Sequence, residues 1–410
     1  MAEIALHPQV FPVPLRTGSD AHYSAAMANI LDRWLRGKDK APDAASGATG
    51  KGASPAAADG LCLDPYDTLS QAAAKAPRAL SWSRAGISDP RHWQDTARIK
   101  LAEVSGYGRF GGPPQVLRRQ DRGIISGLRH ESLYIRVRHG HDIPVRVVSR
   151  DEAPASPRAP VICLQGEGIG MHVSWAESDN TAEAQAVAAG FDFAGEAARR
   201  GHVAICIELM GAGERRPQDL GRAGASLRSL AVHGMLLGHS LIGQHASDVS
   251  MVLNWMTGRE FGIAVDCGRA AVIGHDLGAA AGLLAAALDT RIAAVAMVEP
   301  PPRFRDAIKQ RSIRAEMTMP GLLRWMDLDD ILLLCAPRPI IAGPGPAGST
   351  TASELLAGAR GFYDLFEAGS ALTATDGLAP LWHCLASLLT EPGVAVGEAT
   401  REAGPAARIE

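Results

Sequence analysis

The sequence predicts an α/β fold in which a mostly parallel central sheet carries helices on both faces and is preceded by a mainly helical N-terminal extension. Two alternating segments, 133–138 and 143–148, indicate a β-hairpin. Short apolar segments then alternate with helical patterns, which is typical of parallel strands joined by crossover helices. The expected strands occupy residues 160–164, 203–209, 270–274, 292–298 and 339–342, and the expected helices occupy 181–200, 237–257, 277–288, 352–367 and 380–390.

The N-terminal part has a different sequence pattern, without the alternation of strands and helices. Apolar residues at helical spacing predict helices at 23–35 and 92–104, and a stretch rich in Gly, Ala, Ser and Pro predicts a flexible loop near 41–60. We therefore expect an extension at 1–119, a core at 120–395 and a tail at 396–410. Within the core, 303–333 is rich in Arg, Met and Trp, so it is either a lid whose Met and Trp side chains line a pocket or a helix packed in the core.

Composition excludes several classes of function. The chain has 410 residues, a net charge of −3, 46% hydrophobic residues and 21% charged residues. Nucleic-acid binders usually carry a basic excess, and no segment has the ~18 apolar residues that would span a bilayer. The N-terminus lacks the basic and apolar regions of a signal peptide. We expect a cytoplasmic protein with a small-molecule partner, no nucleic acid and no membrane, and self-association into a homo-oligomer stays open.

The six cysteines are scattered and form no C-x-x-C pair, so we expect neither structural disulfides nor a metal site. The sequence likewise indicates no cofactor.

The most informative stretch is Ala-Ala-Val-Ile-Gly-His-Asp-Leu-Gly-Ala-Ala at 270–280. An apolar strand enters a turn bounded by Gly274 and Gly278 and continues into a helix of small residues. This is the shape of a nucleophile elbow, in which a strained central residue is exposed between a strand and a helix that approach closely. The central residue here is Asp276, and the free N–H groups of the following helix favour its ionised form.

Further segments match one family in the same order. Leu-Gln-Gly-Glu-Gly at 164–168, Glu-Leu-Met-Gly-Ala-Gly-Glu-Arg at 208–215 and Ala-Pro-Arg-Pro at 336–339 accompany the elbow. From about residue 120 to 390 the chain resembles the bacterial acetyl-xylan-esterase-like or dienelactone-hydrolase-like branch of the α/β-hydrolases. The resemblance implies an α/β-hydrolase fold. It also implies a substrate- or oxyanion-binding set, which comprises Gly166, Glu167, Gly168, Leu277, Glu208, Glu214 and Arg215, although Glu214 and Arg215 also fit a structural role in tying their loop down.

The sequence departs from the family pattern at each catalytic position. Asp276 replaces the nucleophilic Ser, residues 343–349 lack the expected carboxylate, and residues 373–380 lack the expected His. His383 and His172 are the candidates for a replacement, and His383 also fits a buried position on a helix face. His275 is expected to pack beneath the sheet as a structural residue. Asp327, Asp329 and Asp330 are expected to form a solvated helix start.

Three functional hypotheses remain. The first is a hydrolase-like enzyme that acts on a small organic substrate, with Asp276 as nucleophile or general base. A carboxylate that attacks a saturated carbon gives an ester, whereas attack on an ester carbonyl would give an anhydride, so a simple ester substrate is disfavoured. The second is a catalytically degenerate homologue that serves as a binding or scaffold protein. The third is a lyase or isomerase that uses Asp276 as a base.

Overall fold

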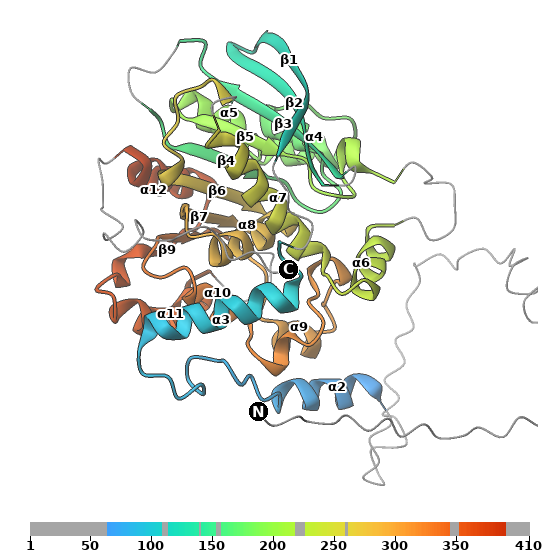
Figure 1. The fold of residues 1–410 in the computed structure, drawn as a ribbon, viewed down its shortest axis with the longest axis vertical. Helices are drawn as coiled ribbons and strands as arrows, with labels where there is room; N and C mark the ends of the chain where they lie inside the picture. The colour runs from blue at the N-terminus through green and yellow to red at the C-terminus, as the bar shows by residue number, and fades with distance from the viewer. Residues whose placement is uncertain are drawn as a thin grey trace, which may run out of the picture. The chain divides into compact units, whose positions relative to one another are not determined.

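The computed structural model describes residues 64–108, 114–138, 141–152, 157–217, 226–258, 261–344 and 352–390. The helix expected at 23–35, the loop expected at 41–60 and the tail expected at 396–410 lie outside the described residues. The described parts are mixed α/β, as the sequence predicts (Figure 1).

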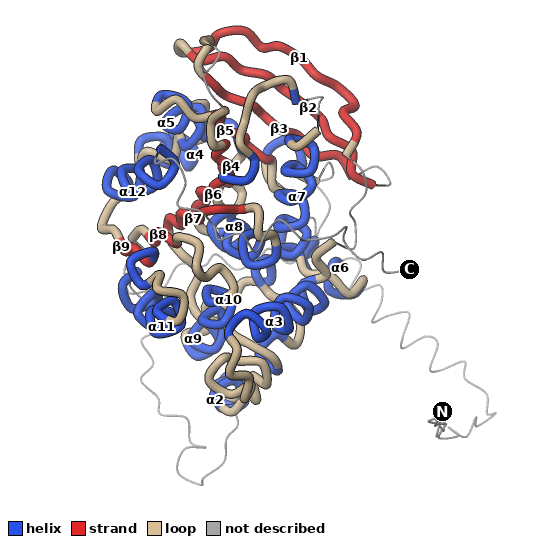
Figure 2. The backbone as a smooth tube through the Cα atoms, turned by 60° about the vertical axis from the view of Figure 1, so that its left-hand side comes forward, coloured by secondary structure: helices blue, strands red, loops and turns tan. Residues whose placement is uncertain are grey.

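A single sheet organises the described chain, and its nine strands have the order β1-β2-β3-β5-β4-β6-β7-β8-β9. The first three strands and the β3–β5 pair are antiparallel, and every pair from β5 to β9 is parallel. In Figure 2, β1, β2 and β3 form a broad antiparallel ribbon at one end of the sheet. The strands are β1 (Gln115–Ile125), β2 (Leu128–Arg138), β3 (His141–Ser149), β4 (Pro160–Leu164), β5 (Val203–Ile207), β6 (Ala270–His275), β7 (Ile292–Val298), β8 (Ile340–Ala342) and β9 (Leu372–Ala374).

The hairpin predicted from alternation is confirmed as β2–β3, in which Leu133 pairs with Val145. Two strands were not predicted. β1 is an edge strand whose middle residues are charged and exposed, so it lacks the apolar alternation that identifies a half-buried strand. β9 has only three residues, too few for a periodic pattern.

Helices cover both faces of the sheet, and two of the predicted helices differ from expectation, one because it is divided and one because it begins later. The helix expected at 181–200 is interrupted at Gly190, whose φ of 88° no helix allows, and the one expected at 237–257 begins later, after Gly238 at φ 79°. The helices are α2 (Pro65–Ala74), α3 (Pro90–Ser105), α4 (Thr181–Ala188), α5 (Phe193–Arg199), α6 (Leu227–Leu236), α7 (Leu241–Met256), α8 (Leu277–Leu288), α9 (Phe304–Lys309), α10 (Leu328–Leu333), α11 (Ala352–Asp364) and α12 (Leu378–Thr390).

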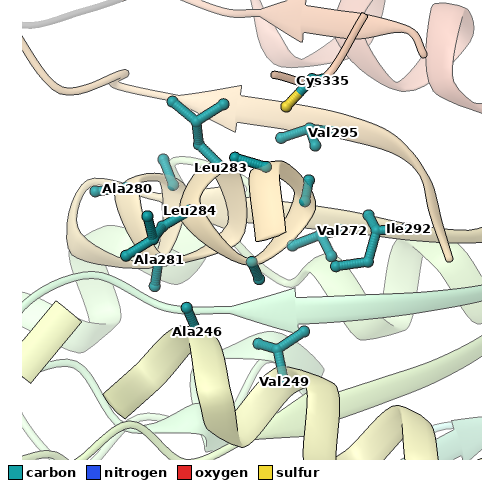
Figure 3. Packing of buried hydrophobic residues seen from close by; sticks show 14 of the residues in the cluster. Ala246, Val249, Val272, Ala280, Ala281, Leu283, Leu284, Ile292, Val295 and Cys335 are labelled. Carbon is teal, nitrogen blue, oxygen red and sulfur yellow. The ribbon is translucent and has the colours of Figure 1, made fainter. Parts of the chain in front are cut away.

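Alternate residues of the central strands enter two separate cores. Val272 of β6 packs with α7 and α8, whereas Ile273 packs on the other face with α5 and α12. Small side chains allow this close packing: in Figure 3, Ala246 of α7 lies near Ala281 and Leu284 of α8. None of the described helices has the length and apolarity needed to cross a membrane.

The described part of the N-terminal extension packs directly on the core. The predicted helix at 92–104 is confirmed as α3, and its Trp93 is completely buried. The Gln94 amide donates hydrogen bonds to the carbonyls of Leu333 and Ala336, at 2.9 and 2.8 Å. This segment therefore packs on the end of α10 and on the connection that leads into β8.

Candidate functional site

The elbow has the strained geometry that its sequence predicts. Asp276 lies between β6 and α8 with φ 50° and ψ −112°, a conformation that costs a non-glycine residue of the order of 1–3 kcal/mol. A Cβ on Gly274 would lie 2.3 Å from the backbone of Gly278, and a Cβ on Gly278 would lie 2.5 Å from the carbonyl oxygen of Leu164. The two glycines therefore allow the contact of strand and helix that holds Asp276 at the strand end.

Arg314 binds the Asp276 carboxylate with both ends of its guanidinium. Nη1 donates to Oδ2 at 3.0 Å, and Nη2 donates to Oδ1. The backbone N–H of Glu167 also points at Oδ2, at 3.4 Å, so this oxygen lies against the loop expected to bind an oxyanion. Burial alone would raise the pKa of Asp276, but Arg314 outweighs it and the pKa lies below its usual value. The carboxylate is therefore held ionised.

Two further carboxylates lie near this ion pair. Nη1 of Arg314 also donates to Oε2 of Glu167, at 2.8 Å. Burial and the nearby charge of Glu316 raise the pKa of Glu167 above its usual value. Arg314 and Glu316 belong to the segment 303–333, so the expected lid does supply side chains to the elbow. Its Met317 and Met319 are buried and line a small apolar cavity beside α8.

His275 and Glu299 form a second pair beside the elbow. The Nε2 of His275 and the Oε2 of Glu299 are 3.2 Å apart, and the ring lies 4.2 Å from that of Phe191 between centroids. Glu299 directly follows β7 and has φ 53°, so adjacent strands each end in a strained non-glycine residue. Burial lowers the pKa of His275 although Glu299 opposes this shift. The expected buried position of His275 is observed, but its partner was not predicted.

The loop after β4 lies directly over the elbow. Gly166 is buried, and a Cβ there would lie 2.6 Å from Nδ1 of His275 and 3.5 Å from Cβ of Asp276. The side chain of Gln165 secures the loop through hydrogen bonds to Ser174 and to the Phe191 carbonyl, both 2.8 Å. Gly168 is exposed, and Leu277 is buried as the first residue of α8.

Glu208, Glu214 and Arg215 hold their loop rather than contact Asp276. Glu208 is 2% exposed and accepts hydrogen bonds from the N–H groups of Met171 (2.8 Å) and Glu214 (3.3 Å). Glu214 is exposed and accepts a hydrogen bond from Tyr134. Arg215 pairs with Asp248 at 2.7 Å. These contacts agree with the structural alternative for this segment.

The two candidate histidines lie away from the hydrogen-bonded group around Asp276. His172 pairs with Glu183, at 2.9 Å, in the segment that follows the oxyanion loop. His383 is exposed in the middle of α12, so the buried position considered for it is wrong. Neither ring has a hydrogen bond to Asp276 among the contacts of the described residues. The loop after β9, Thr375-Asp376-Gly377, contains no His, and residues 345–351 after β8 lie outside the description.

His172, Asp179 and Glu183 also form the one set of three side chains, within the described ranges, whose ligand atoms lie close enough to hold a metal, within 4.8 Å of one another. The carboxylate of Glu183 already has three partners within the protein, because it accepts hydrogen bonds from the N–H groups of Gly170 and Asp179 and from His172. These hydrogen bonds join the start of α4 to the preceding turn.

The acidic cluster begins a helix as expected, but it is not solvated. Asp327 caps α10 and is completely buried, and Asp330 is 3% exposed. Asp327 and Asp330 satisfy each other's backbone in a capping box, and Asp330 also accepts a hydrogen bond from Ser81 of the extension. The expectation failed because a run of acidic residues does not reveal which of them caps a buried helix end.

A cavity of about 760 Å³ lies elsewhere. It is bordered by Ala294 and Pro339, where β7 and β8 begin, and by Arg91 and Phe366. This is the amino end of the strands, opposite the elbow, so this cavity does not mark the elbow site. The strained backbone and the paired charges around Asp276 do.

Comparison with known proteins supports the fold. No protein-family model and no curated protein matches the chain. A solved structure of a Bacteroides fragilis protein assigned as an acetyl xylan esterase is 19% identical, with a TM-score of 0.63 over 78% of this chain and 83% of that one. A glucuronoyl esterase of carbohydrate esterase family 15 from Teredinibacter turnerae is 17% identical, with a TM-score of 0.51 over 77% of this chain and 88% of that one.

A promiscuous esterase of the same family, from a marine bacterial metagenome, is 13% identical, with a TM-score of 0.50 over 72% of this chain and 91% of that one. At these identities the likeness concerns the fold. Together with the nine-stranded sheet and the elbow, it shows that the chain has an α/β-hydrolase fold.

Proposed function

We propose that the protein is a hydrolase that acts on a small organic molecule through Asp276, which attacks a saturated carbon. The observation that carries the proposal is the state of this carboxylate. It occupies the strained elbow position, it is held ionised, and Oδ2 lies against the N–H of the oxyanion loop. This leaves Oδ1 as the attacking oxygen once Arg314 withdraws from it.

The chemistry would proceed in two balanced steps. Oδ1 of Asp276 forms a bond to the substrate carbon while the bond from that carbon to its leaving group breaks, and the leaving group departs with the electron pair. The product of this step is an ester of Asp276. Water then adds to Cγ, the ester bond breaks, and an alcohol and the free carboxylate are released with one proton. The N–H of Glu167, which points at Oδ2, would stabilise the charge on that oxygen in the second step.

The second step needs a group that accepts a proton from water. His275 is the imidazole nearest in sequence to Asp276, and Glu299 holds its Nε2. Because a carboxylate accepts hydrogen bonds, this contact leaves the lone pair on Nδ1, a buried atom without a hydrogen bond that faces Gly166. We assign the proton acceptor to His275 as part of the proposal.

Intact-mass spectrometry tests the proposal with a panel of small epoxides and alkyl halides. The variant His275→Gln should accumulate a covalent adduct on Asp276, because alkylation proceeds while hydrolysis of the ester is slowed. Asp276→Asn is the matched control and should gain no mass. If no member of the panel adds mass to either the wild type or His275→Gln, attack by Asp276 on such carbons is refuted.

One observation favours a second candidate, a ligand-binding protein without turnover. Arg314 occupies both carboxylate oxygens, and no described imidazole donates a hydrogen bond to them. In that case the wild type would bind a ligand at the elbow with no product and no adduct. The adduct experiment separates the two candidates.

A further inference from the structure

The group around Arg314 contains more negative than positive charge. Asp276 and Glu167 share the one guanidinium, and Glu316 lies close enough to raise the pKa of Glu167. Glu316 is 5% exposed, and no residue that the structure describes gives it a hydrogen bond or an ion pair. Three carboxylates therefore lie around one guanidinium, so the group favours cations.

We propose that the elbow site recognises the cationic end of a small organic molecule, a guanidinium or primary ammonium group, which takes the position that Arg314 now fills. This inference names the ligand class of the site described under the proposed function and rests on that function only for turnover. In it, Oε2 of Glu167 and Oδ2 of Asp276 bind the cation, and Oδ1 of Asp276 faces the rest of the molecule.

The geometry of Arg314 shows that the site accepts such a group. One nitrogen, Nη1, bridges Oε2 of Glu167 at 2.8 Å and Oδ2 of Asp276 at 3.0 Å, so two carboxylates converge on a single donor. A planar guanidinium or a compact ammonium offers the same donors. An anionic ligand would instead add a fourth negative charge to this group.

The side chain of Arg314 can move away from Asp276 and Glu167 without disrupting a helix or strand. It precedes the three-residue turn Ala315–Met317, and its side chain is 35% exposed. Withdrawal would free Oδ1 of Asp276 at the moment a cation arrives, so ligand binding and exposure of the reacting oxygen would be coupled.

Calorimetric titration with methylguanidinium tests the proposal on Arg314→Gln, with N-methylurea as the neutral analogue. Removing the competing side chain should strengthen binding about tenfold or more relative to the wild type, because a tethered group competes at millimolar effective concentration. Arg311→Gln is the matched control, since Arg311 is an exposed arginine of the same segment that pairs with Asp64. It should behave as the wild type. Equal binding of methylurea, or no gain in Arg314→Gln, would overturn the inference.

A second measurement covers the case in which Arg314→Gln does not fold. The wild type should bind n-butylammonium saturably at low ionic strength, and Glu167→Gln should weaken this binding about fivefold, as expected for loss of one charged partner. Unchanged affinity in Glu167→Gln contradicts the proposal. Because binding is measured without turnover, a protein that binds the cation yet forms no adduct on Asp276 refutes the proposed function and leaves this inference standing.

Discussion

Asp248 provides the sharpest test of how the loop beside the oxyanion loop is held. Its carboxylate is 4% exposed and accepts a hydrogen bond from Arg215 at 2.7 Å, and His141 lies at 2.9 Å. Asp248→Asn keeps the shape of the side chain but removes its charge, which leaves the 9%-exposed Arg215 without its ion pair. Breaking a buried pair in this way costs about 3 kcal/mol.

Equilibrium unfolding in urea, followed by far-UV circular dichroism, measures this loss. Asp151→Asn is the control, because its partner Arg129 and Asp151 itself are both about half exposed and the free energy of unfolding should hardly change. A loss below about 1 kcal/mol in Asp248→Asn would refute the reasoning that this pair anchors the loop.

The same carboxylate predicts how stability depends on pH. Burial opposes ionisation, but Arg215 and His141 lower the pKa of Asp248 from 3.8 to about 2. Because the folded pKa is depressed, the contribution is complete above about pH 5 and is lost as the pH falls through 4 towards 2; it amounts to about 2 kcal/mol. The wild type should therefore lose more stability than Asp248→Asn over this interval, and parallel pH profiles would contradict the assignment.

Four further substitutions test the framework and the chemistry of the site. Gly274→Ala should cost about 3 kcal/mol or prevent folding, because the new Cβ would lie 2.3 Å from backbone atoms, whereas Gly361→Ala, at an open helical position, should stabilise by up to about 1 kcal/mol; urea unfolding compares them. Arg338→Lys should cost about 3 kcal/mol in the same assay, since its buried guanidinium donates to five backbone carbonyls that three ammonium hydrogens cannot all reach. Asp276→Ser should be inactive on p-nitrophenyl acetate, because no described imidazole forms a hydrogen bond with the elbow side chain; clear esterase activity would show that a conventional ester site survives.

Periodicity could predict the parallel core because each strand there is a continuous apolar segment and each crossover helix has an apolar face. The elbow could be located because its two glycines allow a close contact between a strand and the helix that follows it directly in the sequence. By contrast, β1 is a charged edge strand, and the division between α4 and α5 depends on the backbone conformation of Gly190, which sequence spacing does not reveal.

The partners of Asp276 could not be predicted for a different reason. Arg314 lies 38 residues further along the chain and meets Asp276 through tertiary packing of the lid. The only signal in the sequence was that the lid segment is rich in arginine. Glu299 could have been found by its position directly after β7, which is the parallel neighbour of the elbow strand. Residues that follow neighbouring parallel strands lie close together at the carboxyl end of the sheet. His383 was a candidate because it lies close to the position expected for the catalytic His, but it is exposed in the middle of α12.

The most direct test of the central claim is a single turnover in heavy-oxygen water, with an alkylating substrate identified by adduct formation. If Asp276 is the nucleophile, water attacks Cγ of its ester. One heavy oxygen should then appear in the peptide that contains Asp276, while the alcohol produced carries an ordinary oxygen. Heavy oxygen in the alcohol and none in Asp276 would show that water attacks the substrate directly, and would contradict the account.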